Sequence, residues 1–262
     1  MKIAGADNMR EVILSHLNTA NWPFALEGSK VSSINEAGDQ LVMLRSPELI
    51  AVLQNGNSDV IFCGDDILKE RELQFRSLGQ DAPNVREIAR FEKYGRKMVQ
   101  PTLDLVMPQV KAKDGTGWIE PGHIIVTEHP YITRDFLESR SLRTVEIGSR
   151  PEIPLLPRYF KKWAEEEGVV GILVIKGKAP GLLELGYGDA AILVNETGRT
   201  VKENDLYVAA TIRKIRTLLI ASRIGPKTEG NRIEKLARNL EEAYLLMSTR
   251  ELESTGPNPE RL

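Results

Sequence analysis

The sequence has little of the chemistry from which disulfides and metal sites are built. Cys63 is its only cysteine, which excludes an intrachain disulfide and a Cys-x-x-Cys metal site. The three histidines, His16, His123 and His129, do not have the spacing of metal ligands. We therefore assign no metal-binding residues from the sequence.

The chain also lacks long apolar runs and a strong net charge. No stretch approaches the ~20 uninterrupted apolar residues of a membrane-spanning helix, and the first residues carry no apolar run typical of a signal peptide. The formal net charge of −2 does not indicate a surface that binds nucleic acid through bulk charge. We expect a cytoplasmic globular protein with neither a membrane nor a nucleic-acid partner. Its 262 residues suffice for one large domain or two small ones.

Short apolar segments typical of strands alternate with segments of helical periodicity, which predicts an α/β fold. The polar residues 111–117 predict a hairpin or loop, and we expect disorder after Ser254. The expected strands are 1–4, 40–44, 59–62, 103–107, 123–127, 143–147, 171–175 and 190–194, and the expected helices are 10–17, 46–54, 132–138, 159–167, 182–185 and 232–247.

Residues 190–204, AAILVNETGRTVKEN, are the most informative segment. A buried strand is predicted for 190–194, and a helical turn for 201–204. Between them, backbone N–H groups, the dipole of the following helix and two threonine hydroxyls can hold a phosphate. An isolated T-G-x-T pattern also fits an ordinary strand-to-helix loop. The residues of this candidate phosphate loop are Glu196, Thr197, Gly198, Arg199 and Thr200.

The segment from Gly186 to Thr200 resembles the phosphoribosyl-diphosphate loop of the ATP phosphoribosyltransferase family, which begins histidine biosynthesis. Residues 41–68 are similar to a second pattern of that family, in which an Arg is followed by a helix, a G-x-x-D-L-G-I-x-G-x-D turn and a Val-Leu. Residues 125–134 are similar to the family's segment I-A-T-x-Y-P-N-L-T-R. The tail, 210–247, has the family's helix pattern. The four segments follow in the family's order, with an insertion near 150–168.

The resemblance implies a two-lobed fold of the type II periplasmic-binding-protein kind, with a C-terminal helix. Residues 1–103 plus 209–262 would form lobe I, and residues 104–208 would form lobe II, which carries the phosphoribosyl-diphosphate loop. The site would lie in the cleft. The resemblance also implies a homo-oligomer, and it leaves a regulatory subunit open.

The activity implied is transfer of 5-phosphoribosyl from phosphoribosyl diphosphate, with Mg²⁺, to a nitrogen of ATP or of another heterocyclic acceptor. Residues 196–200 would hold the 5′-phosphate, and no catalytic residue is assigned. Asp65 and Asp66 also fit a purely structural role, as a helix N-cap and an acid in the first turn of that helix. Arg45 also fits an ordinary surface arginine without a ligand. The residues implied on the acceptor and pyrophosphate side are Arg45, Gly64, Asp65, Asp66 and Arg10.

Three departures from the family pattern weaken the case for ATP as the acceptor. Leu193 stands where the family has an acid that reaches the ribose hydroxyls. Asp7 stands within the family's P-K-G-R segment, and Arg10 comes one position late. The family's G-S-V-E-x-A-P segment has two imperfect counterparts, 149–154 and 177–180. A non-catalytic sensor of small anions or nucleotides, or a regulatory partner on the same fold, therefore stays an alternative. Pyrophosphate release would distinguish an enzyme from such a binder.

Overall fold

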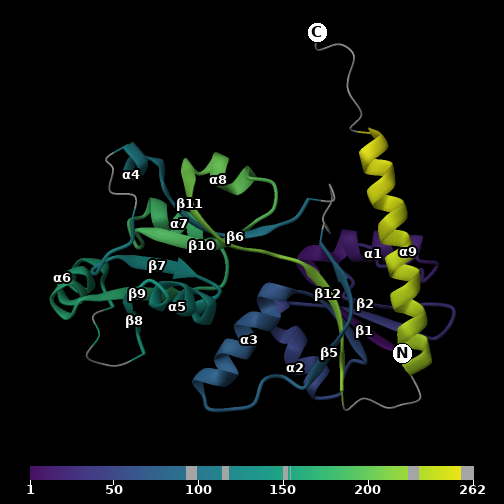
Figure 1. Ribbon diagram of the computed structural model, residues 1–262. Helices are drawn as coiled ribbons and strands as arrows, with labels where there is room; N and C mark the ends of the chain where they lie inside the picture. The colour runs from purple at the N-terminus through teal and green to yellow at the C-terminus, as the bar shows by residue number, and fades with distance from the viewer. Residues whose placement is uncertain (93–98, 114–117, 150–152, 154, 224–229, 255–262) are drawn as a thin grey trace, which may run out of the picture. The chain divides into compact units, whose positions relative to one another are not determined.

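The computed structural model describes residues 1–92, 99–113, 118–149, 153, 155–223 and 230–254 (Figure 1). The chain forms two compact units, each built on a six-stranded sheet. Unit 1 comprises Met1–Arg71, Gln80–Gln100 and Ile215–Leu262, and unit 2 comprises Glu72–Gly79 and Pro101–Lys214.

The sheet of unit 1 has the order β2-β3-β1-β4-β12-β5. Its three strands β3, β1 and β4 are parallel, whereas β2, β12 and β5 pair with their neighbours in antiparallel fashion. The carboxyl ends of the three parallel strands therefore share one edge. The strands are β1 (Lys2–Ala6), β2 (Ser32–Ile34), β3 (Gln40–Leu44), β4 (Val60–Gly64), β5 (Val85–Phe91) and β12 (Thr217–Ser222).

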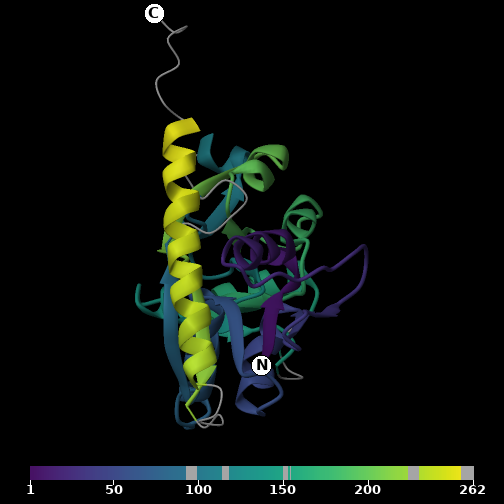
Figure 2. The ribbon, with the colours of Figure 1, turned by 90° about the vertical axis from the view of Figure 1, so that its right-hand side faces the viewer.

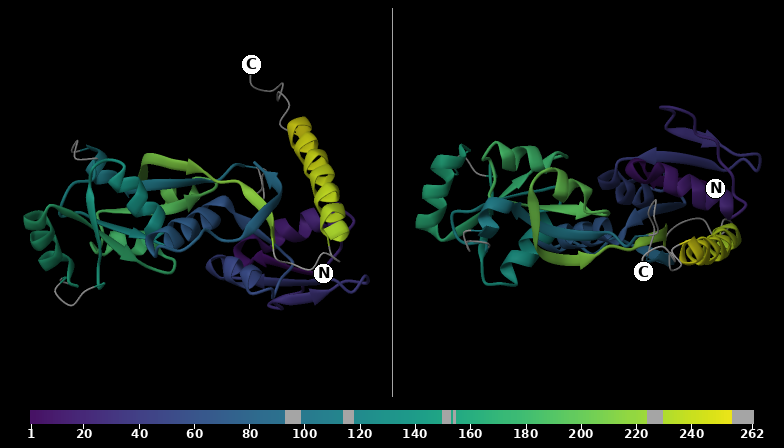
Figure 3. Two further views of the ribbon diagram at one scale, coloured as in Figure 1. Left: turned by 60° about the horizontal axis from the view of Figure 1, so that its bottom comes forward. Right: turned by 90° about the horizontal axis from the view of Figure 1, so that it is seen from above.

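Helices cover both faces of this sheet, because successive strand residues alternate between two buried clusters. Ile3 and Phe62 pack with α1 and α9 on one face, whereas Ala4 and Ile61 pack with α2 on the other. Figure 2 and Figure 3 show the long α9 helix in yellow. The helices of this unit are η1 (Asp7–Met9), α1 (Arg10–Thr19), η2 (Ser46–Glu48), α2 (Leu49–Gln54) and α9 (Gly230–Ser254), and α3 (Asp65–Ser77) begins here and ends in unit 2.

The sheet of unit 2 has the order β11-β6-β10-β7-β9-β8. Strands β10, β7, β9 and β8 are parallel, and β6 is antiparallel to both β10 and β11. The strands are β6 (Thr102–Pro108), β7 (Ile124–Thr127), β8 (Arg143–Glu146), β9 (Val169–Val174), β10 (Ala190–Asn195) and β11 (Leu206–Lys214).

Two buried clusters join the helices of unit 2 to its sheet. Val201 and Leu183 pack against Val106 and Ala191, and Phe160 packs beside Ile124. Gly171 makes room for the Phe160 ring, because a Cβ there would lie 2.5 Å from it. The helices are α4 (Gln109–Lys113), α5 (Pro130–Glu138), α6 (Pro157–Glu167), α7 (Ala179–Glu184) and α8 (Arg199–Glu203).

The predicted alternation of strands and helices is confirmed, with corrections. Residues 111–113 are helical within α4 rather than part of a hairpin, while 114–117 and the residues after Ser254 lie outside the described residues. Residues 46–54 begin as a 3₁₀ turn at Pro47 before α2. The apolar face of α9 packs on its own unit through Ile233, Leu236 and Leu240. None of the described helices has the length and hydropathy needed to cross a bilayer.

A buried carboxylate ties three elements of unit 2 together. Asp189 accepts hydrogen bonds from Lys111 and Lys161 through one oxygen, each at 2.8 Å, and from the Ile124 amide through the other, at 2.9 Å. Burial favours a higher pKa for Asp189, but the hydrogen bonds from Lys111, Lys161 and Ile124 outweigh it and hold the pKa below its ordinary value. The charged form therefore stabilises the folded unit.

We expect Asp189→Asn to lower the free energy of unfolding by about 1–3 kcal/mol at pH 7. Because the folded-state pKa is depressed, this contribution exists above the unfolded pKa of about 4 and is lost as pH falls through the folded pKa. Urea unfolding at pH 7 and at decreasing pH below 4 should show the two proteins converging. Asp81→Asn, at an exposed position, is the control and should leave stability unchanged. A gap that stays constant with pH would contradict the assignment.

Candidate functional site

The candidate phosphate loop leaves the carboxyl end of β10 and enters α8 through a glycine. Gly198 has a φ of 73°, in the left-handed region, and nothing lies within 4 Å of where its Cβ would be. Glycine is therefore required here by the backbone conformation rather than by crowding, and another residue would cost about 1–2 kcal/mol. The helix α8 that follows has only five residues, so its dipole is small. Hydrogen-bond donors of the loop therefore contribute more to holding a phosphate than the helix dipole does.

The turn is fixed from inside by Asn195, the last residue of β10. Its side-chain oxygen accepts the Gly198 N–H at 2.9 Å, and its amide nitrogen donates to Asp104 Oδ2 at 2.8 Å. The Thr102 hydroxyl donates to the same Asp104 oxygen at 2.9 Å. The sequence analysis missed these residues, although a charged residue within the apolar LDLVMP segment and an Asn three positions before the glycine were visible signals.

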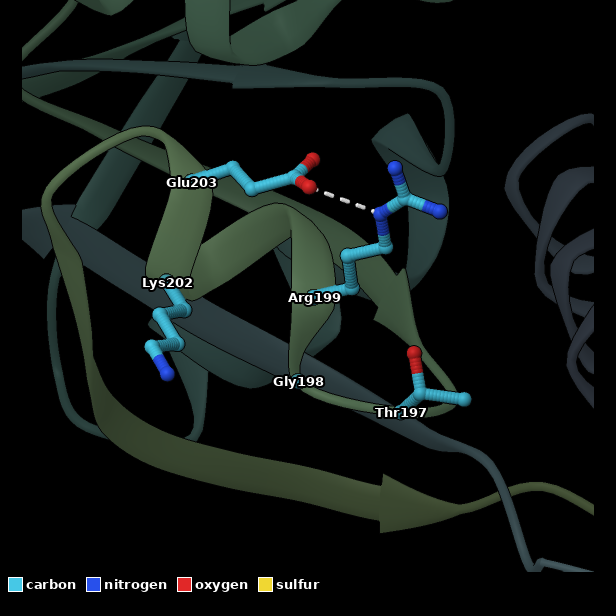
Figure 4. Close-up of a pocket in the computed structure, with 5 residues that line it drawn as sticks. All are labelled: Thr197, Gly198, Arg199, Lys202 and Glu203. Carbon is cyan, nitrogen blue, oxygen red and sulfur yellow. Dashed lines mark hydrogen bonds and ion pairs between the residues drawn. The ribbon is translucent and has the colours of Figure 1, made fainter.

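The outer surface of the loop presents several hydrogen-bond donors. Thr197, Arg199 and Thr200 are exposed. An open hollow of about 500 Å³ is lined by Thr197, Gly198 and Arg199 together with Lys202 and Glu203, which the sequence analysis did not single out. Figure 4 shows Arg199 beside Glu203, with the Lys202 side chain pointing elsewhere. The hollow therefore combines hydroxyl and cationic donors.

Arg199 is held by an exposed partner. Its Nε lies 2.7 Å from Glu203 Oε1, one helical turn later, and the side chains are 79% and 57% exposed. Solvent-exposed pairs of this kind are weak. A phosphate can therefore compete with Glu203 for the guanidinium.

Other residues follow β7 and β9, which run parallel to β10, at the same sheet edge. His129 comes after β7, is buried, and donates its backbone N–H to Thr127 Oγ1 at 2.9 Å. Lys176 and Lys178 come after β9 and are exposed. Ligands of open α/β sheets bind outside the carboxyl ends of the strands. The candidate loop is thus at the expected edge of this sheet.

Three turns in unit 1 carry the implied acceptor-side residues. Arg45 follows β3, Arg10 follows β1, and the turn from Gly64 to Asp66 follows β4. These strands are parallel neighbours, so the fold brings the residues to one edge. Arg45 is exposed there.

Arg10 already has several partners within unit 1. Its guanidinium donates to Asp7 at 2.7 Å and to the carbonyl oxygens of Gly28 and Lys30 at 3.0 and 2.8 Å. Its side chain is 19% exposed. A ligand would have to displace some of these acceptors to use this cation.

The Gly64–Asp66 turn is tightly packed. A Cβ on Gly64 would collide with the Asp66 carboxylate, and Asp66 is 4% exposed in the first turn of α3. Asp65 accepts the Arg216 N–H at 3.1 Å and donates its own N–H to the Arg216 carbonyl. Burial and the two aspartates raise the pKa of the neighbouring Cys63 thiol, which stays protonated.

Leu193, which departs from the family pattern, has a carboxylate opposite it. In the antiparallel pairing of β10 with β6, Leu193 pairs with Asp104 and Asn195 pairs with Thr102. Paired residues lie on the same face of a sheet.

In the part of the chain that the structure describes, no three His, Cys, Asp or Glu side chains converge as a metal site.

Comparisons with known proteins identify the family and the fold. Residues 45–242 match the family model HisG: ATP phosphoribosyltransferase. The ATP phosphoribosyltransferase of Lacticaseibacillus paracasei is 25% identical over 201 residues, covering 76% of this chain and 74% of that protein. A chain of the ATP phosphoribosyl transferase (HisG:HisZ) complex from Thermotoga maritima superposes with a TM-score of 0.67 at 21% identity, covering 95% of this chain and 99% of that chain.

The alkanesulfonate-binding protein SsuA from Xanthomonas axonopodis pv. citri has the same fold, with a TM-score of 0.51 at 11% identity over 99% of this chain and 80% of that one. The predicted α/β fold of the type II periplasmic-binding-protein kind is therefore confirmed. Because the family model covers well over half of the sequence, the chain belongs to the ATP phosphoribosyltransferase family, the pentosyltransferases of histidine biosynthesis.

Proposed function

We propose that this chain transfers the 5-phosphoribosyl group of phosphoribosyl diphosphate to a nitrogen of ATP, and that residues 196–200 hold the 5′-phosphate. The observation that carries the proposal is the loop itself. Gly198 turns the backbone at a φ of 73°, Asn195 fixes the turn, and exposed hydroxyl and guanidinium donors surround it. This arrangement provides several donors to one phosphate without a long helix.

In this reaction the bond from ribosyl C1 to the pyrophosphate oxygen breaks, and a bond from C1 to the acceptor nitrogen forms. Holding the 5′-phosphate orients C1 toward the nucleophile. Mg²⁺, when bound, neutralises charge on the departing pyrophosphate. Among the described residues, no three His, Cys, Asp or Glu side chains converge to hold a metal ion by themselves.

We assign the acceptor and the pyrophosphate to the carboxyl edge of β3, β1 and β4. Arg45 is an exposed cation there, and the Gly64–Asp66 turn follows β4 at the same edge. Asp65 and Asp66 shape this turn through backbone and packing contacts. Arg10 is largely engaged by acceptors of its own unit, and another nitrogen heterocycle is the alternative acceptor.

We also propose that the chain assembles as a homo-oligomer that works with a regulatory subunit. The support for a second kind of subunit is the structural neighbour from Thermotoga maritima, which belongs to a HisG:HisZ complex, whereas the homo-oligomer is what the family resemblance implies. Leu245 and Leu246 in the last part of α9 are 64% and 55% exposed, and they are candidates for such a contact.

The proposed reaction is tested by calorimetric titration with phosphoribosyl diphosphate and Mg²⁺, followed by addition of ATP while pyrophosphate is measured. We expect donor binding and ATP-dependent pyrophosphate release. Donor binding with no response to ATP would reject ATP as the acceptor and direct a screen of other heterocycles. Donor binding without turnover on any of them would indicate the non-catalytic binder. If the donor does not bind, the proposal is wrong.

The role of the loop is tested by Arg199→Ala, which should weaken binding of phosphoribosyl diphosphate about tenfold because a charge-assisted hydrogen bond to phosphate is lost. Glu203→Gln frees the same guanidinium and should leave affinity equal or raise it slightly. Arg90→Ala is the matched control, because Arg90 forms a similar ion pair with Glu87 in β5. Equal affinity of the Arg199 variant and the wild type would rule out this arginine as a phosphate ligand.

A further inference from the structure

Asp104 is a buried acid in the middle of an apolar strand. It is 2% exposed and lies in β6 between Leu103 and Leu105, which are also buried. Burying a carboxylate is unfavourable unless hydrogen bonds compensate for the lost hydration. Its position in the sheet therefore calls for a role that a leucine could not fill.

The contacts of Asp104 lead to the phosphate loop. Asp104 Oδ2 accepts from the Thr102 hydroxyl and from the Asn195 amide, and Asn195 in turn accepts the Gly198 N–H. The Thr102 hydroxyl also reaches the Asn195 carbonyl at 3.3 Å. Within the described ranges, Asp104 Oδ1 is buried and has no hydrogen-bond partner. All interactions that offset the burial of this acid are therefore directed at the base of the loop.

A carboxylate determines which way the Asn195 amide is turned. Ionised carboxylate oxygens only accept hydrogen bonds, whereas an amide has a donor end and an acceptor end. Facing Asp104, Asn195 points its NH₂ group at Oδ2, and its oxygen points at the Gly198 N–H. An apolar residue at 104 would leave both orientations of the amide open and the Gly198 turn without a fixed acceptor.

We propose that Asp104 is a positioning residue for the phosphate loop and that it acts through Asn195. The inference rests on the proposed binding of the 5′-phosphate at residues 196–200. It assigns the conformation of that loop to an acid on the neighbouring strand, outside the T-G-x-T motif. Asp104 itself does not touch the reacting atoms in this role.

Two substitutions separate hydrogen bonding from charge. In Asp104→Asn, the amide oxygen takes the place of Oδ2 and still accepts from Thr102 and Asn195, whereas Asp104→Ala removes the acceptor. We expect Asp104→Ala to raise the KM for phosphoribosyl diphosphate about tenfold and to leave the acceptor KM unchanged. Asp104→Asn should restore most of the donor affinity. If Asp104→Ala binds the donor as tightly as the wild type, the proposal is wrong.

Coupling with Asn195 tests the route. If Asp104 acts through Asn195, the double variant Asp104→Ala/Asn195→Ala should bind the donor no more weakly than Asn195→Ala alone. Additive losses would overturn the proposal. Asp189→Ala is the matched control, because it removes another buried carboxylate, next to the other end of β10, and should lower the melting temperature while leaving the donor KM unchanged.

A readout without ligand keeps this inference separate from the proposed function. Amide hydrogen exchange at Gly198 should be slow in the wild type, tenfold or more faster in folded Asp104→Ala, and near the wild-type rate in Asp104→Asn. Unchanged exchange in Asp104→Ala would refute the positioning role whatever the protein binds. A wild type that does not bind phosphoribosyl diphosphate would refute the proposed function instead.

Discussion

The antiparallel pairing of β6 with β10 is the constraint on which the candidate phosphate loop depends. This register places Thr102 opposite Asn195 and Asp104 opposite Leu193, so the polar groups at the end of β10 meet on one face. A shift of one residue would move the acid to the other face and remove the hydrogen bond that orients Asn195. The conformation of the loop therefore depends on both β6 and β10, although the T-G-x-T motif follows only β10.

Parallel pairing has a comparable effect in each sheet. In unit 1 it gathers Arg45, Arg10 and the Gly64–Asp66 turn at the ends of β3, β1 and β4. In unit 2 it brings the candidate loop to the same edge as the residues that follow β7 and β9. Residues far apart in the sequence thus become neighbours because the strands before them run in one direction.

The sequence was sufficient for the elements with strong local patterns. Residues 40–44 form β3 as predicted, and residues 159–167 lie within α6. Strand β5, VREIARF, was not predicted, since its charged residues mask the alternation of a half-buried strand. Helix α3 was not among the predicted helices, and its start was given only as the alternative for Asp65 and Asp66, because charged residues dominate DDILKERELQFRS and blur its apolar face.

The site divides in the same way. The exposed loop residues belong to one continuous motif, and the sequence placed them next to a strand end. Lys202 and Glu203 also line the hollow, because the helix α8 places them on the same side as the loop. The T-G-x-T motif does not include these two residues. Thr102 and Asp104 come from another strand, so only pairing could connect them with Asn195.

Leu193 illustrates what a comparison along one strand misses. By position, Leu193 stands where the resemblance to the family implies an acid. In space, a carboxylate still occupies that level of the sheet, because Asp104 lies directly across from Leu193. Asp104 accepts hydrogen bonds from Thr102 and Asn195, so it has a structural role. A carboxylate at 193 as well would set two like charges opposite each other, which is unfavourable in an antiparallel pair. A leucine at 193 avoids this repulsion.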